Sequence, residues 1–217
     1  LGVASAKLAS DFEESLNKVN VAFGHSSMVI QDFAKTTLES FGIAEGSALE
    51  MASLFGDMAT SMGLSQEEAA KMSVSLVGLA GDLASFKNIG IDQAQTALAG
   101  IFTGETETLK RLGIVMTEAS LKSFALSKGL DANVKSMTQA QKVALRYRFI
   151  LNSTGNAQGD FARTSDGVAN TTRSVTESLK ELGKEVGVII LPVTKKLLAI
   201  SESITNGFRK LSDENKE

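Results

Sequence analysis

From Val168 to Leu211 the chain repeats an apolar residue, or once a threonine, every three or four positions without a break. Up to Val193 the steps alternate strictly four and three, which is the spacing of the a and d positions of a coiled coil. Beyond Val193 two consecutive steps of four appear, so the spacing drifts toward a straighter helix. This stripe, here called the seam, comprises Val168, Thr172, Val175, Leu179, Leu182, Val186, Ile189, Val193, Leu197, Ile200, Ile204, Phe208 and Leu211.

The seam predicts a long amphipathic, coiled-coil-like helical segment over residues 161–217, and it needs a partner helix or a wall to bury against. Pro192 lies inside the segment. Because proline removes one backbone hydrogen bond and clashes with the preceding turn, we expect a kink or a helix restart there. Leu191 is then the last residue before the bend.

Shorter apolar stripes at helical spacing run from Ile30 to Leu151 and are separated by glycine turns. Among these turns only residues 113–116 could form a strand, and we interpret them as irregular because no pairing partner is evident. We therefore predict an all-α protein: a compact helical domain over residues 1–155, a hinge at 156–160 and the long segment after it. Four spacings of a polar residue and a side chain three positions later predict capping boxes. They are Ser47 with Glu50, Ser65 with Glu68, Asp92 with Gln95, and Thr138 with Gln141.

Glycines recur within the apolar stretches, at Gly78, Gly81, Gly183 and Gly187. Each costs about 1 kcal/mol relative to alanine inside a helix. We expect these glycines to allow either the close approach of two helices or easier unfolding.

Composition excludes several classes of function. The chain contains a single proline, and its net charge of −3 argues against a nucleic-acid-binding surface. It has no cysteine, which excludes disulfides and thiolate metal sites, and its only histidine, His25, is interpreted as a turn residue. The longest apolar run, Val186 to Val193, is too short to span a bilayer, so no transmembrane segment is expected. The sequence begins without methionine and ends in charged residues, from which we expect a fragment of a longer protein.

One enzyme class deserves comparison, the peptidoglycan lytic transglycosylases. Glu39-Ser40, followed later by the turn from Gly63 to Gln66, superficially matches their catalytic glutamate and the motif after it. A single catalytic carboxyl needs a desolvated pocket, usually with aromatic walls for a sugar ring, yet the chain has no Trp and one Tyr. The turn is better explained as the end of one helix and the cap of the next. We therefore expect no enzyme activity, and no catalytic, cofactor-binding or metal-binding residue is predicted.

Several stretches resemble tail tape measure proteins, the long helical proteins of tailed bacteriophages, prophages and phage-tail-like bacteriocins. The resemblance runs from about Phe12 to Val193, nearly the whole chain, and several blocks in the right order make it more specific than any single motif. The blocks are FEESLNKVNVAFG from Phe12, SLFGDMATSMGLSQEEAAKMS from Ser53, GLAGDLASFKNI from Gly78, IFTGETETLKRLGIVMT from Ile101, NAQGDFARTSDGVAN from Asn156, and ESLKELGKEVGVIILPV from Glu177.

The resemblance implies a structural role in the virion. Such proteins lie in the lumen of the tail tube, set its length during assembly and are released at infection. The partners it implies are the tail tube protein, tail assembly chaperones in the host cytoplasm and baseplate hub proteins, with other copies of the chain as a further candidate. It transfers no catalytic residue. A domain of about 150 residues is roughly 30 Å or more across. A folded domain of that width cannot occupy a narrow tube lumen unchanged. We therefore hypothesise that residues 1–155 are metastable and rearrange into extended helices inside the tail or after ejection.

A second function remains open, that of a helix-binding adaptor whose seam docks a chaperone or tube protein as a helix in a groove. A third, less favoured one is the transglycosylase that uses Glu39. The sequence also leaves open whether the seam pairs with itself, with a second copy or with residues 1–155.

Overall fold

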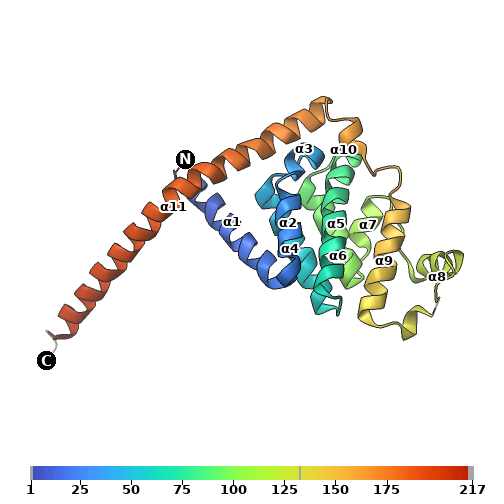
Figure 1. Ribbon diagram of the computed structural model, residues 1–217, viewed down its shortest axis with the longest axis horizontal. Helices are drawn as coiled ribbons and strands as arrows, with labels where there is room; N and C mark the ends of the chain where they lie inside the picture. Colours follow the sequence, from blue (N-terminus) through green and yellow to red (C-terminus); the bar gives the residue numbers. More distant parts are fainter. Residues whose placement is uncertain (1, 132, 215–217) are drawn as a thin grey trace.

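The computed structural model describes residues 2–131 and 133–214, and it confirms the predicted all-α class (Figure 1). No strand occurs among these residues. The elements in chain order are α1 (Gly2–Phe23), the 3₁₀ turn η1 (Gly24–Ser26), α2 (Ser27–Ala34), α3 (Thr37–Phe41), α4 (Glu45–Ser61), α5 (Gln66–Lys87), α6 (Ile91–Thr103), α7 (Glu107–Arg111), α8 (Glu118–Ser127), the 3₁₀ turn η2 (Val134–Ser136), α9 (Gln139–Ser153), α10 (Asp160–Arg163) and α11 (Val168–Glu214).

Helices α1 to α10 form a compact body around α5, whose buried residues run along most of its length. The ring of Phe55 on α4 stacks on that of Phe102 on α6, with centroids 5.8 Å apart. Gly56 lies so close to Phe23 that an added Cβ would stand 2.2 Å from the ring, and at Gly81 it would stand 2.7 Å from the carbonyl oxygen of Phe41. Glycines inside the body's helices therefore allow close packing, which is the first of the two roles predicted for them.

Two of the four predicted capping boxes are confirmed and two are wrong. Ser65 with Glu68 opens α5, and Thr138 with Gln141 opens α9. Helix α4, in contrast, begins at Glu45 with Ala44 as N-cap, and Ser47 lies inside it. Helix α6 begins at Ile91 after Gly90, with no side-chain cap. At α4 the polar partners come from a distant part of the chain, as described below.

Helix α11 extends over 47 residues and includes Pro192 without interruption, so no restart occurs. Its first part lies across the body, and its second part projects away from it in a visibly different direction (Figure 1). Leu191 is the last buried residue among those of the helix whose burial the structure describes. Pro192 therefore stands at the boundary between the docked and projecting parts, where the missing backbone hydrogen bond favours a bend.

The residues before α11, including those predicted as a hinge, are held against α5 by Asp82. This side chain is 6% exposed, and its carboxylate accepts hydrogen bonds from the backbone N–H groups of Gly159 at 2.7 Å and Phe161 at 3.2 Å. Asp160 in turn accepts from the hydroxyl of Ser85 at 2.6 Å. Burial raises the pKa of Asp82 above its ordinary value and outweighs the lowering by the two N–H donors.

This raised pKa predicts a pH dependence of stability. The folded protein binds a proton on Asp82 more tightly than the unfolded chain does, so this contribution is complete below the unfolded pKa of about 3.9. It is lost as the pH rises through the folded-state pKa. We expect the difference in unfolding free energy between the unmodified chain and Asp82→Asn to shift in favour of the unmodified chain as the pH falls from 7 to 4. Urea unfolding at several pH values measures it, and a difference that stays constant contradicts the prediction.

Candidate functional site

The predicted seam lies on one continuous surface of α11, and that surface faces solvent. Relative exposures of its aliphatic residues range from 40% at Val186 to 85% at Val168. We call this surface the outer face; it comprises Val168, Val175, Leu179, Leu182, Val186, Ile189, Val193, Leu197, Ile200 and Ile204. Thr172 is exposed with them, whereas the side chains of Phe208 and Leu211 lie outside the described residues. Of the three partners that the sequence leaves open, the described residues 2–131 and 133–155 of the same chain do not cover the outer face.

Helix α11 docks on the body through the opposite surface, here called the inner face. Its residues recur at helical spacing but are mostly polar or small: Asn170, Arg173, Glu177, Glu181, Lys184, Gly187 and Leu191. This face has no apolar periodicity, so the pattern of apolar residues along the sequence did not predict it. The available signal was the pair of glycines at 183 and 187, which indicated a close helix approach.

Two carboxylates of the inner face cap the N-terminus of α4. Glu177, only 5% exposed, accepts hydrogen bonds from the backbone N–H of Ala44 at 3.1 Å and from the hydroxyl of Ser47 at 3.3 Å. Glu181 accepts from the backbone N–H of Glu45. Negative charge at this position also complements the positive end of the helix dipole. A helix start whose N-cap is an alanine is thus stabilised by side chains more than 130 residues later in the chain.

Lysines balance these carboxylates. Lys184 forms ion pairs with Glu45 at 2.7 Å and Glu181 at 2.8 Å, and its ammonium lies 4.7 Å from the centroid of the Phe12 ring. Burial alone lowers the pKa of Lys184, but the hydrogen bonds to the two glutamates outweigh it and hold the pKa above its ordinary value. Lys180 pairs with Glu177 at 2.7 Å. At the junction of α1, α4 and α11, two ammonium groups therefore pair with three carboxylates at the N-terminal end of α4.

The start of α11 is fixed on α5. Arg173 donates to the carbonyl oxygens of Ala84 at 2.9 Å and Ile89 at 3.1 Å, which caps the C-terminal end of α5. Asn170 donates to the hydroxyl of Ser85 at 2.7 Å and bonds Thr164 as well. Hydrogen bonds to the N-terminus of α4 and to the C-terminal end of α5 thus fix the direction of α11.

Helix α11 approaches α1 most closely at its glycines. A Cβ on Gly187 would lie 1.8 Å from the backbone carbonyl oxygen of Ser5, and a Cβ on Gly183 would lie 2.6 Å from Leu8. The backbone of Ser5 can approach the helix at Gly187 only because this residue carries no side chain, whereas at Gly183 the side chain of Leu8 occupies the space. Further along, Lys195 forms an ion pair with Glu13 at 2.7 Å.

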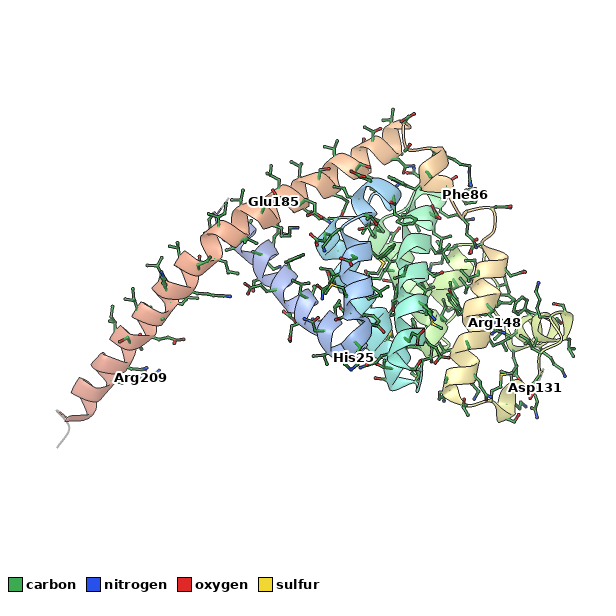
Figure 2. All side chains as sticks on the ribbon, in the orientation of Figure 1. His25, Phe86, Asp131, Arg148, Glu185 and Arg209 are labelled. Atoms are coloured by element: carbon green, nitrogen blue, oxygen red, sulfur yellow. The ribbon has the colours of Figure 1, made fainter. Side chains whose placement is uncertain are left out.

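The residues weighed for catalysis are placed as follows. Glu39 is exposed, so its carboxyl lacks the desolvation that a general acid requires. Gly63 adopts a positive φ of 93° after α4, and Ser65 caps α5, as the alternative interpretation of that turn predicted. His25 is an exposed residue of η1, and Figure 2 shows it at the end of the body away from the docked part of α11. Within the described residues no cluster of His, Asp and Glu has the arrangement of a metal site.

Comparison with known proteins returns no match: no family model, no curated protein and no solved structure is similar to this chain. None of the helices in the described part of the chain combines the length and apolar character needed to cross a membrane.

The capping role of Glu177 predicts a local and a global effect of its removal. We expect Glu177→Ala to lower the free energy of unfolding by about 1–3 kcal/mol, because it leaves the donors at the start of α4 without their charged acceptor. Amide hydrogen exchange at Ala44 and Glu45 should accelerate. Glu185→Ala is the matched control, since Glu185 is an exposed residue of the same helix (Figure 2). Equal effects of the two substitutions would show that the cap is unimportant.

The helix crossing gives a second prediction. Alanine normally stabilises a helix interior by about 1 kcal/mol relative to glycine. At position 187 we expect the reverse, a loss of about 1–3 kcal/mol from forced separation of the helices. Tryptic cleavage after Lys184, whose side chain is largely buried, should become faster. Gly155→Ala serves as control, because nothing lies within 4 Å of its added Cβ. Stabilisation by Gly187→Ala would contradict the packing described.

Proposed function

We propose that this chain is the helical part of a structural tail tape measure protein, which sets the length of a tail tube during assembly and leaves the tail at infection. The resemblance of its sequence blocks to that family supports the proposal. The observation that carries it is the form of α11, a continuous helix of 47 residues whose second part projects from the body (Figure 1). At 1.5 Å per residue this helix is about 70 Å long, so residue count translates directly into distance.

The location of the resembling blocks gives further support. The block from Gly78 to Ile89 lies in and just after α5, and the block from Asn156 to Asn170 contains α10. These two blocks hydrogen-bond to one another through Asp82 and Ser85, and the block from Glu177 contains the carboxylates that cap α4. The blocks therefore include the residues that fix the long helix in place, which suits a protein whose function depends on a rod of defined direction.

In this role the folded body is too wide for a narrow tube lumen. We therefore propose that it rearranges into extended helices there. The inner face of α11 favours such a change, because mostly polar groups hold the helix on the body. The tail tube protein, the assembly chaperones and the baseplate hub are the proposed partners, in the virion tail and, during assembly, in the host cytoplasm.

An adaptor that binds a partner helix is the second candidate, and the exposure of the outer face favours it. Truncation at Gln158 is a poor test, because it also removes the N–H donors that bind Asp82. Substitutions on the outer face leave these contacts in place and are preferable.

A ruler function predicts a linear response of tail length. Duplication of one, two and three heptads in the projecting part of α11, within the particle that encodes this chain, should lengthen the tail by about 10 Å per heptad. Deletion of residues 197–203 should shorten it. Electron microscopy of tails measures both. Normal tails of unchanged length in every variant would refute the ruler, whereas an adaptor predicts that outcome.

A further inference from the structure

A pocket of about 420 Å³ lies in the body between the end of α6, the turn η2 and helices α8 and α9. We call it the α9 pocket, because Gln139, Lys142 and Arg146 of α9 lie along it. Its volume falls within the range of small-molecule sites, about 300–1,000 Å³. Figure 1 shows α8 and α9 at the end of the body away from the projecting part of α11, so the α9 pocket is separate from the contacts that hold α11.

The lining of the α9 pocket carries an excess of positive charge. Lys135 of η2 joins Lys142 and Arg146 of α9, and the one carboxylate of the lining is that of Glu118 at the start of α8. Three positive charges and one negative charge give the lining a net charge of +2, whereas the whole chain carries −3. In the part of the chain that the structure describes, none of the three cations forms an ion pair. An anionic ligand would supply the missing negative charge.

The positions of two of these cations are unfavourable for α9 itself. Lys142 and Arg146 are four residues apart on one face of the helix, and like charges at this spacing destabilise a helix. Lys142 also directly follows the first turn of α9, near the positive end of the helix dipole, and that turn contains no acidic residue. A bound anion removes both costs, whereas stability of the fold alone gives no reason for this arrangement.

Arg146 is fixed in place by the end of α6. Its Nη1 atom donates to the carbonyl oxygens of Ile101 at 3.1 Å and Phe102 at 3.2 Å. Its Nη2 atom lies beside Gly104, where an added Cβ would stand 2.8 Å from it, and has no acceptor among the described residues. The N–H donors on Nη2 therefore remain available to a ligand in a fixed direction. Burial lowers the pKa of Arg146 below its ordinary value, and no carboxylate in the described part of the chain counters this effect.

The remaining lining indicates the class of anion. A phosphomonoester carries about −1.5 to −2 charges at pH 7 and three acceptor oxygens, which match a lining charge of +2 and three cationic side chains. A single carboxylate supplies only one charge and two oxygens. Buried Met116 and Leu121, with half-buried Val134, form an apolar floor, and Thr106 and Gln139 add polar groups. The floor suits a flat organic group attached to the phosphate.

We propose that the α9 pocket binds a phosphomonoester of a small organic molecule. The phosphate lies between Lys135, Lys142 and Arg146. The organic part, of which a nucleoside is the simplest example, packs on Met116 and Leu121. The proposal does not rest on the tape measure role. It is tested by ligand binding to the purified chain, whereas the role is tested by tail length, so the failure of one is distinguishable from that of the other.

The first test is calorimetric titration of the full chain with adenosine 5′-monophosphate, glucose 6-phosphate, inorganic phosphate and adenosine. We expect saturable binding of one adenosine 5′-monophosphate per chain, weaker binding of glucose 6-phosphate and inorganic phosphate, and none of adenosine. Absence of saturable binding by both esters at millimolar concentration overturns the proposal. Equal binding of adenosine overturns the role of the three cations. Binding of glucose 6-phosphate or inorganic phosphate as tight as that of the nucleotide overturns the role of the apolar floor.

The second test locates the ligand with two substitutions that remove the same charge. Lys142→Gln should weaken binding of adenosine 5′-monophosphate by about tenfold, since it removes a charge-assisted hydrogen bond. Arg148→Gln is the matched control, because Arg148 is an exposed cation of the same helix that lies outside the pocket (Figure 2). It should leave the affinity nearly unchanged. Equal weakening by the two substitutions would show unspecific attraction and overturns the proposed site.

Urea unfolding without ligand separates binding from a structural role. We expect Lys142→Gln to be at least as stable as the unmodified chain, because it relieves the repulsion between Lys142 and Arg146. Adenosine 5′-monophosphate should stabilise the unmodified chain against urea more than it stabilises Lys142→Gln. Loss of stability in ligand-free Lys142→Gln, together with unchanged affinity for the nucleotide, assigns Lys142 to the fold and overturns the proposal.

Discussion

The hydrogen bonds from the start of α4 to Glu177 and Glu181 determine which side of the long helix meets the body. An amphipathic helix would ordinarily bury its apolar side, and the free energy available from that is large. Here the inner face satisfies backbone donors that have no other partner, and leaving such donors buried and unpaired costs about 1–3 kcal/mol each. Ion pairs with Lys184 and Lys180 stabilise these carboxylates in their partly buried position. The apolar side remains exposed as a direct result.

The same principle operates where the chain passes from the body into α11. Asp82 binds the backbone of the residues before the helix, and Arg173 binds the backbone at the end of α5. In each case a charged side chain hydrogen-bonds to backbone N–H or C=O groups that lack a partner at a helix end or turn. The direction of α11 therefore depends on a few directional bonds, and the glycines at its crossing with α1 bring the two backbones close enough for these bonds to form.

Local patterns in the sequence suffice for the helical class, for the caps of α5 and α9 and for the stripe of α11, because each depends on residues within a few positions of one another. The cap of α4 could not be predicted in this way. Ser47 and Glu50 have the spacing of a capping box, but the competing acceptors from α11 lie more than 130 residues away and start the helix at Glu45 instead. Likewise Asp82 reads as a charge interrupting an apolar stretch until its two backbone donors are known. The seam was predictable as a stripe, but its exposure depended on the polar inner face, whose contacts are all non-local.

The contact between Ser5 and Gly187 joins the first helix to the last, and this has a consequence for folding. Loop closure over such a separation is entropically costly and slow compared with the formation of neighbouring helices. During synthesis from the N-terminus, α4 emerges long before Glu177 and Glu181 exist, so its first turn must remain hydrated or frayed until α11 is made. Docking of α11 is then the last step, and it completes helices that began to form much earlier.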